Sequence, residues 1–109
     1  MEKFVKGDIV VIPFPFSDLS GSKKRPALVL AGLQGDDIIL CQITSQQTKD
    51  KYAIAIKESD FKLGILSTPS NIRPNRIFTA DKNIIIKKAS SLNESAVNSV
   101  IQKIISILS

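Results

Sequence analysis

The chain has 109 residues, which is enough for one domain with a hydrophobic core and too few for two. Its contents of 43% hydrophobic and 23% charged residues are ordinary for a soluble globular protein. The net charge of +5 suits a polyanionic partner, such as a nucleic acid or an acidic protein. The absence of histidine excludes His-based acid–base catalysis and His-containing metal sites.

Three further features predict a cytoplasmic protein without membrane association. The N-terminal sequence MEKFVKGD has no hydrophobic region of the signal-peptide kind, and no apolar run approaches the roughly 20 residues that a membrane span needs. The single cysteine, Cys41, fits a reducing compartment, and its apolar surroundings predict a buried side chain. The chain shows no repeat or linker, so residues 1–109 are expected to form a single domain.

The first half of the chain has the pattern of strands and turns. Phe4–Pro13 alternates and is rich in β-branched residues, which predicts a strand, whereas Phe14–Lys24 has the Pro, Ser, Asp and Gly content of a loop. A second strand is predicted at Pro26–Ala31, a turn at Gly32–Asp37, and a third strand at Ile38–Thr44.

Shorter elements are predicted in the next segment. Tyr52–Ile56 is expected to be a fourth strand, and Ser59–Gly64 a turn or a single helical turn. Ile72 and Ile77–Thr79 are expected in extended segments that Pro74 interrupts.

The C-terminal region changes from a strand pattern to a helical one. After a last predicted strand at Ile84–Lys88, Ser91 and Glu94 have the spacing of a capping box at a helix start. Apolar residues then recur at spacings of three and four, as on one face of a helix. These are Val97, Val100, Ile101, Ile104, Ile105 and Leu108. The fold class is therefore expected to be mainly β, with a small curved barrel packed against a C-terminal helix.

Three segments together resemble the PemK/MazF family of toxins. Gly7–Leu30 (GDIVVIPFPFSDLSGSKKRPALVL) is similar to the family's N-terminal signature, in which an Arg-Pro pair opens the second apolar strand. Leu40–Gln46 (LCQITSQ) resembles the third strand, and Pro74–Lys82 (PNRIFTADK) resembles a late strand with a basic residue and a threonine. The resemblance covers nearly the whole chain.

The resemblance implies an SH3-like barrel of the CcdB/MazF type and a homodimer that cleaves single-stranded RNA without metal or cofactor. It also implies a cognate acidic antitoxin that silences the enzyme, with operator DNA contacted only through the antitoxin. One departure bears on the cleavage motif and on proton transfer. Many members have an acidic residue or Gln just before the Arg-Pro pair, whereas this chain has Ser20–Lys24 there, and Asp18 is the only acid in the loop.

Metal-free RNA cleavage needs groups that stabilise charge on the phosphoryl oxygens. Arginine suits this task because its planar fork binds two phosphate oxygens and stays charged. Arg25, in the family position before Pro26, is the first catalytic candidate, and its alternative is a solvated arginine at a strand start. The resemblance makes Thr44 the second, as a hydroxyl donor to phosphate, and its alternative is a threonine that only ends a strand.

Other polar and basic residues are candidates for RNA binding through phosphates or base edges. They are Asp18, Ser20, Ser22, Lys23, Lys24, Ser45, Gln46, Gln47, Arg73, Arg76 and Thr79. Lys23 and Lys24 would neutralise phosphates, and Gln46 and Gln47 would read bases, although all four also fit ordinary loop residues. For Arg76 the alternative is an ion pair with Asp81 or Glu58.

Two other functions stay open at this point. A CcdB-like gyrase inhibitor has a barrel of this type and acts without catalysis through its C-terminal helix, commonly with aromatic residues there. The C-terminus IQKIISILS has none, which disfavours that function. The second is an inactive RNA-binding barrel, against which Arg25 and Thr44 argue.

Overall fold

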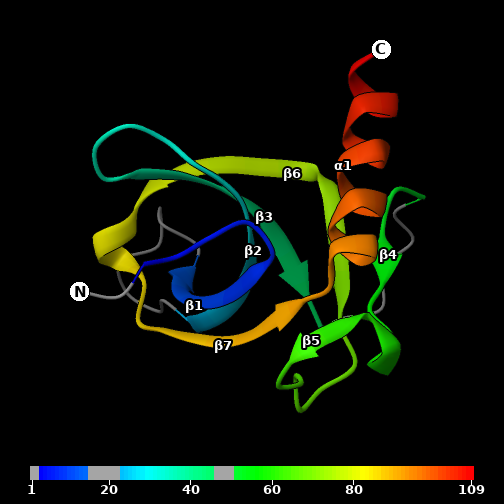
Figure 1. Cartoon of the computed structure of the whole chain (residues 1–109), viewed down its shortest axis with the longest axis horizontal. Helices are drawn as coiled ribbons and strands as arrows, with labels where there is room; N and C mark the ends of the chain where they lie inside the picture. The colour runs from blue at the N-terminus through cyan, green and yellow to red at the C-terminus, as the bar shows by residue number, and fades with distance from the viewer. Residues whose placement is uncertain (1–2, 15–22, 46–50) are drawn as a thin grey trace.

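The computed structural model describes residues 3–14, 23–45 and 51–109. In this part of the chain seven strands form one antiparallel sheet in the order β4-β6-β3-β2-β1-β7-β5. The strands are β1 (Asp8–Phe14), β2 (Lys23–Gly32), β3 (Asp37–Thr44), β4 (Ile54–Ala55), β5 (Phe61–Leu63), β6 (Asn71–Asp81) and β7 (Lys87–Leu92). Two 3-10 turns, η1 (Glu58–Asp60) and η2 (Lys82–Ile84), and the helix α1 (Glu94–Leu108) complete the fold. The sheet curls into a half-barrel with α1 along one side (Figure 1), which confirms the predicted fold class.

The sheet has a hydrophobic core on each of its faces, because successive strand residues point to opposite sides. The helix-side core consists of Ile9, Leu28, Cys41, Ile43, Ile72, Leu92 and the α1 residues Val97 and Val100. The η2-side core, against which Ile84 of η2 packs, consists of Val10, Ile12, Ala27, Val29, Ile38 and Leu40. The central strands therefore contribute alternate residues to two cores.

The helix begins two residues later than the capping box predicted. Asn93 is the N-cap, and its side chain accepts a hydrogen bond from the Ala96 amide at 2.8 Å. The capping role predicted for Ser91 is wrong, because this residue is buried at the end of β7 and donates to Asp8 Oδ1 at 2.9 Å. The Ser91 hydroxyl forms this tertiary hydrogen bond with Asp8, so it does not cap the helix.

The predicted apolar face of the helix is confirmed over its first half. Val97 and Val100 are buried in the helix-side core. Ile105 and Leu108, at the far end of the stripe, are 49% and 78% exposed. The barrel therefore covers only part of this face. No helix in the described part of the chain is long and apolar enough to span a membrane.

β1 begins at Asp8, so the predicted strand Phe4–Pro13 starts too early. Gly7 has a φ of 100°, which turns the chain just before the strand, and a Cβ there would lie 3.3 Å from Val97 Cγ2. Val5 N donates to Asp8 Oδ2 at 2.9 Å across the same turn. The Gly-Asp pair thus has a structural role, in which it directs the chain into the sheet.

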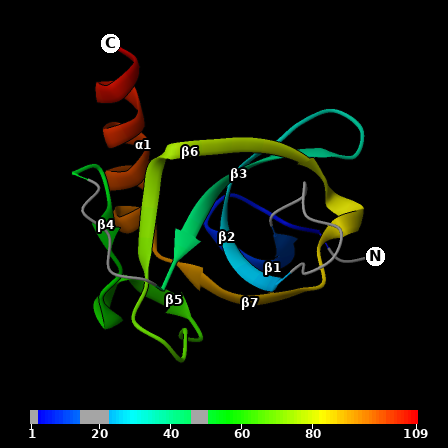
Figure 2. The same cartoon turned by 180° about the vertical axis from the view of Figure 1, so that it is seen from behind.

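β6 is one continuous strand, whereas the sequence predicted two segments separated by a proline. The strand passes through the buried Pro74 by means of a bulge. Cys41 of β3 pairs with Ile77 of β6, and Ile43 pairs with Ile72, so an advance of two residues along β3 matches an advance of five along β6. β6 bends sharply beside α1 (Figure 2). A bulge of this kind accommodates proline because the ladder is already broken there.

The shortest strands differ most from the prediction. β4 has only two residues within the predicted strand Tyr52–Ile56, and β5 lies in the segment predicted as a turn, Ser59–Gly64. β7 begins at Lys87, near the end of the predicted strand Ile84–Lys88. Strands this short depend on the neighbour with which they pair, β6 for β4 and β7 for β5, and not on their own hydrophobic pattern.

Cys41 is buried, as predicted, and its thiol ties two strands together. Its Sγ atom donates to the carbonyl of Arg73 at 3.0 Å, across the bulge of β6. Burial raises the pKa of Cys41 to about 12, so the thiol stays protonated and unreactive in the folded protein. Cys41 is therefore a structural residue.

We expect Asp8→Ala to lower the free energy of unfolding by about 2–4 kcal/mol, measured by urea denaturation. Asp8 is only 3% exposed, and its carboxylate accepts from Val5 N and from the Ser91 hydroxyl. Lys88 Nζ lies 4.0 Å from Oδ1. Removing the carboxylate leaves these donors without their acceptor.

The matched control is Asp36→Ala. Asp36 forms an exposed ion pair with Lys82 at 3.4 Å, and exposed pairs contribute about 0–1 kcal/mol. If the Asp8 variant were no less stable than this control, the structural role of the buried carboxylate would be refuted.

Candidate functional site

The two catalytic candidates lie on the face of the sheet that carries the η2-side core. Ala27 of β2 pairs with Gln42 of β3, and this register, continued by two residues, places Arg25 directly opposite Thr44. Arg25 shares the face of Ala27, and Thr44 shares the face of Leu40, since both are an even number of residues away. Facing residues of antiparallel strands have Cβ atoms ~5 Å apart. A guanidinium and a hydroxyl are thus brought together.

Arg25 lies inside β2, not at the start of a strand that Pro26 opens. Its backbone pairs with Ile12 of β1, whereas the ladder to β3 begins only at Ala27. Pro26 has no N–H to donate, which is consistent with this late start. Arg25 is therefore held by β1 on one side and lies just beyond the β3 ladder on the other. The Arg25 side chain is half-buried, and its backbone is anchored by pairing with β1.

Thr44 is the last residue of β3 and is 7% exposed. Ile43, beside it, is fully buried in the helix-side core and fixes the end of the strand. On the side away from β2, Thr44 pairs with Asn71 of β6. The threonine is therefore flanked by polar residues from both neighbouring strands, Arg25 and Asn71.

Arg76 joins the same face from β6. Cys41 pairs with Ile77, and the register then shifts, so Gln42 lies opposite the bulged segment of β6 that ends at Arg76. Arg76 also shares the side of Phe78, which packs against the η2-side core. The bulge of β6 therefore places the exposed Arg76 at the edge of the face on which Arg25 and Thr44 lie.

The side chains of Arg25 and Arg76 have no ion pair or hydrogen bond with any residue that the structure describes. The ion pair of Arg76 with Asp81 or Glu58 is therefore not formed. Arg73 is half-buried, and its carbonyl accepts the hydrogen bond from the Cys41 thiol. The donors of Arg25 and Arg76 are thus not used by other described residues, whereas Arg73 holds the bulge through its backbone carbonyl.

Gln42 belongs to this surface and was not predicted from the sequence. Its Oε1 atom is buried and has no hydrogen-bond partner among the residues that the structure describes. The residue lies between the Arg25–Thr44 pair and Arg76. A signal was present in the sequence, because Gln42 is a polar residue in an apolar strand and precedes Thr44 by two positions, which puts both on one face. We call Arg25, Gln42, Thr44 and Arg76 the arginine surface.

Three predicted RNA-binding residues lie apart from the arginine surface. Lys24 directly precedes Arg25, so strand alternation points it to the opposite face, where it is exposed. Ser45 is exposed just after β3. Thr79 pairs with Ile39, towards the other end of β3, and is exposed on the face opposite Phe78.

The remaining predicted residues are Lys23, which begins a described segment, and five residues that the structure does not describe. Lys23 is the first residue of β2, where its backbone pairs with that of Phe14. Five residues lie outside the described part of the chain: Asp18, Ser20, Ser22, Gln46 and Gln47.

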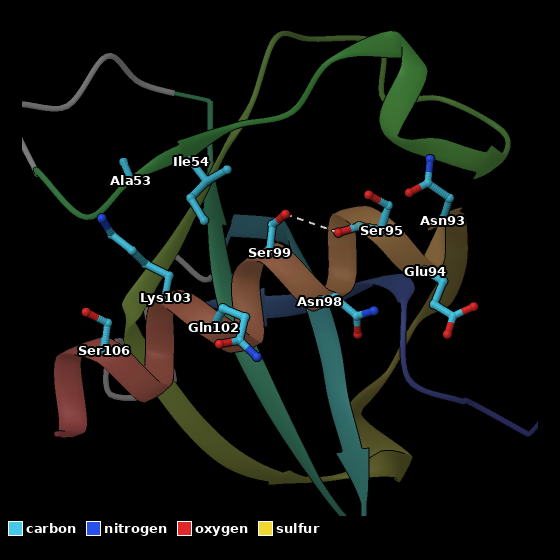
Figure 3. A pocket seen from close by; sticks show the side chains of 10 residues that line it. All are labelled: Ala53, Ile54, Asn93, Glu94, Ser95, Asn98, Ser99, Gln102, Lys103 and Ser106. Atoms are coloured by element: carbon cyan, nitrogen blue, oxygen red, sulfur yellow. Dashed lines mark hydrogen bonds between the residues drawn. The ribbon is translucent and has the colours of Figure 1, made fainter.

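A groove of about 1060 Å³ runs between β4 and α1 (Figure 3). Its lining residues are Ala53, Ile54, Asn93, Glu94, Ser95, Asn98, Ser99, Gln102, Lys103 and Ser106. The Ser99 hydroxyl is directed along the helix and donates to the Ser95 carbonyl at 3.1 Å. Since the groove lies on the helix side of the sheet and includes none of the predicted site residues, it is separate from the arginine surface.

The arginine surface is suited to a phosphodiester. Two guanidinium groups and a hydroxyl offer donors to phosphate oxygens, and a rigid sheet positions them before a ligand arrives. Among the described residues, no group of three Cys, Asp or Glu side chains could hold a metal ion.

Comparison with known proteins agrees with this architecture. The chain is similar to MazF (Form-I) from Deinococcus radiodurans, with a TM-score of 0.77 and 18% identity over 99% of this chain and 98% of that one. It is similar to MazF in the MazE–MazF complex (Form-II) of the same organism, at 0.75 and 17% over 99% and 97%. An endoribonuclease from mycobacterial species gives 0.73 and 14% over 99% and 93%. These likenesses confirm the predicted MazF-like fold.

The sequence comparisons extend from fold to family. No curated protein matches the chain by sequence. The family model for the PemK-like, MazF-like toxin of type II toxin–antitoxin systems matches residues 5–108, which is nearly the whole chain. The protein therefore belongs to the PemK-like, MazF-like toxins of type II toxin–antitoxin systems.

Proposed function

We propose that this toxin is an endoribonuclease that cleaves single-stranded RNA, without a metal ion, on the arginine surface. The observation that carries the proposal is the register of β2 with β3, which brings Arg25 opposite Thr44 when it is continued two residues past the pair Ala27–Gln42. Further support comes from the similar fold of the mycobacterial endoribonuclease. The net charge of +5 also favours a polyanionic substrate.

The reaction uses a nucleophile that RNA itself supplies. The 2′-oxygen attacks the adjacent phosphorus, a new 2′-O–P bond forms, and the bond from phosphorus to the 5′-oxygen breaks. The products are a 2′,3′-cyclic phosphate and a free 5′-hydroxyl, so one proton leaves the 2′-oxygen and another reaches the 5′-oxygen. The protein must hold this attack in line and stabilise negative charge on the phosphoryl oxygens.

Arg25 and Thr44 divide the charge stabilisation between them. The guanidinium of Arg25 binds two phosphoryl oxygens at once, and its donors are not occupied by any described residue. The Thr44 hydroxyl donates to one of the same oxygens from the facing strand. Arg76, beyond Gln42, contacts a neighbouring phosphate and sets the direction of the RNA across the sheet.

We expect Arg25→Ala to reduce RNA cleavage on the order of 10²–10³-fold while fold and oligomeric state are preserved. Arg25→Lys should recover little of the activity, because a point charge does not replace a bidentate fork. Cleavage of one RNA substrate is measured in EDTA, with circular dichroism as the test of folding.

The matched control for this series is Lys62→Ala, which removes an exposed basic side chain from β5 and should leave cleavage unchanged. If a folded Arg25→Ala protein cleaved RNA at nearly the wild-type rate, the assignment of Arg25 would be lost. Activity that disappears in EDTA for the wild type would contradict the metal-free mechanism.

A homodimer is the second part of the proposal, and the exposed end of α1 supports it. The last turns of the helix project beyond β6 (Figures 1 and 2). Ile105 and Leu108 are exposed there, and Ile77 of the neighbouring β6 is 40% exposed. Large apolar side chains that one barrel leaves uncovered are typical of a surface that a second copy buries.

We expect sedimentation of the wild type at micromolar concentration to give about twice 11.9 kDa. Leu108→Asp should shift the mass towards the monomer, because it places a charge in the apolar contact without affecting the core. Leu33→Asp, at an exposed apolar residue of the β2–β3 turn, is the control and should remain dimeric. A wild type that sediments as a clean monomer would refute the homodimer.

The third part is a cytoplasmic partnership with an acidic antitoxin encoded nearby. Similar structures include a mycobacterial endoribonuclease in complex with its cognate antitoxin and a MazE–MazF complex. A basic surface shaped for phosphates also attracts a carboxylate-rich segment that folds when it binds.

Expression of the toxin alone should stop growth, and co-expression of the neighbouring small open reading frame should restore it. The Arg25→Ala toxin should be harmless without the antitoxin, which separates loss of toxicity from loss of expression when protein levels are matched. A harmless wild type at the same expression level would contradict the toxic role.

A further inference from the structure

We infer that Gln42 is a specificity residue, whose side-chain amide hydrogen-bonds the edge of one RNA base beside the cleaved bond. The inference rests on the proposed RNA cleavage and adds a recognition contact to it. Its starting point is the buried Oε1 atom of Gln42, for which no residue in the described part of the chain supplies a hydrogen bond. An unpartnered buried amide oxygen is unfavourable for the folded protein. Such an atom is explained when a ligand supplies the missing donor.

The location of Gln42 fits a contact one nucleotide unit away from the reacting phosphate. Gln42 and Thr44 lie on the same face of β3, so their Cα atoms are ~7 Å apart along the strand. The β2–β3 register, continued two residues past Ala27–Gln42, brings Arg25 opposite Thr44, and Gln42 itself faces the β6 bulge that ends at Arg76. The amide is therefore next to the phosphate position but between two arginines, where a base or sugar must pass.

The chemistry of the amide favours a base over a phosphate. Phosphate oxygens only accept hydrogen bonds, so they cannot satisfy the Gln42 Oε1 acceptor, and Arg25 and Arg76 already match them. A base edge presents a donor and an acceptor side by side, which is the pattern that one glutamine amide complements. In single-stranded RNA these edges are unpaired and open to side chains.

The ribose 2′-hydroxyl is the other donor that RNA offers, and it leads to a different expectation. A contact to the 2′-hydroxyl would be the same for all four nucleotides. A contact to a base edge would favour one nucleotide at one position of the cleavage site. The sequence preference of cleavage therefore distinguishes these two sources of the donor.

The experiment compares wild type, Gln42→Met and Gln42→Glu on a long RNA in EDTA, with the fragment ends mapped by sequencing. Oligonucleotides with each base at the positions that flank the cleaved bond then give kcat and KM. Gln42→Met keeps the length and apolar stem of the side chain but has no strong donor or acceptor. Gln34→Ala, in the exposed β2–β3 turn, is the control.

We expect Gln42→Met to lower kcat/KM for the preferred base roughly 10- to 100-fold and to change the other three much less. Gln42→Glu retains an acceptor and loses the amide donor, so it should shift the preference towards bases that offer an amino group. Because Gln42→Met removes an unpartnered buried polar atom, its melting temperature should rise by roughly 4–8 °C. A residue with a merely structural role would not combine greater stability with lost selectivity.

Three results would overturn the inference. An unchanged cleavage motif and rate in Gln42→Met shows that the amide makes no contact with substrate. An unchanged motif with a uniform loss of rate assigns the contact to the ribose or backbone. If the folded wild type cleaves no RNA, the proposed function fails, and the specificity role fails with it, whereas the first two results leave the proposed function intact.

Discussion

Side chains of a strand alternate between two faces, and β3 has a hydrophobic core on each face. Cys41 and Ile43 are buried towards the helix, and Leu40 is buried towards η2. A slip by one residue would exchange the two sets and drive Gln42 into the helix-side core. The hydrophobic effect therefore fixes the register of β3 against β2 and β6. The arginine surface inherits its geometry from this register, since Thr44 and Gln42 are carried by the same strand as the buried residues.

The bulge of β6 is the second constraint, and it depends on the first. Pro74 is buried at a place where the regular ladder with β3 is interrupted, and the Cys41 thiol binds the Arg73 carbonyl across that interruption. This contact involves no charged thiol, because burial raises the pKa of Cys41 to about 12. The irregular segment is thus tied to the most regular strand of the sheet. Arg76 follows at the exit of the bulge, directly before Ile77, where the regular ladder with β3 resumes.

The sequence predicts the features that have a local cause and fails where a tertiary contact decides. The third strand and the apolar helix face were predictable from their periodicity, whereas the catalytic roles of Arg25 and Thr44 come from the family resemblance and stay predictions. β5 was missed because three residues carry too little pattern, and the cap at Ser91 was wrong because Asp8, distant in sequence, binds that hydroxyl. Gln42 was missed because an unpartnered atom is a property of the folded surroundings. Its two-residue spacing from Thr44 was visible, but it gains meaning only when β2 and β6 are placed on either side.

The two faces of the sheet also separate stability from recognition. On the helix side, α1 covers the apolar residues of the sheet, so side chains there are chosen by packing. On the opposite face, the η2-side core covers only one end of β3, and the strand continues as Gln42 and Thr44 beyond it. At this end Gln42 has an acceptor that no described residue satisfies. An amide whose acceptor the described residues leave unsatisfied lowers stability, which favours a role in binding for Gln42 over a role in stability.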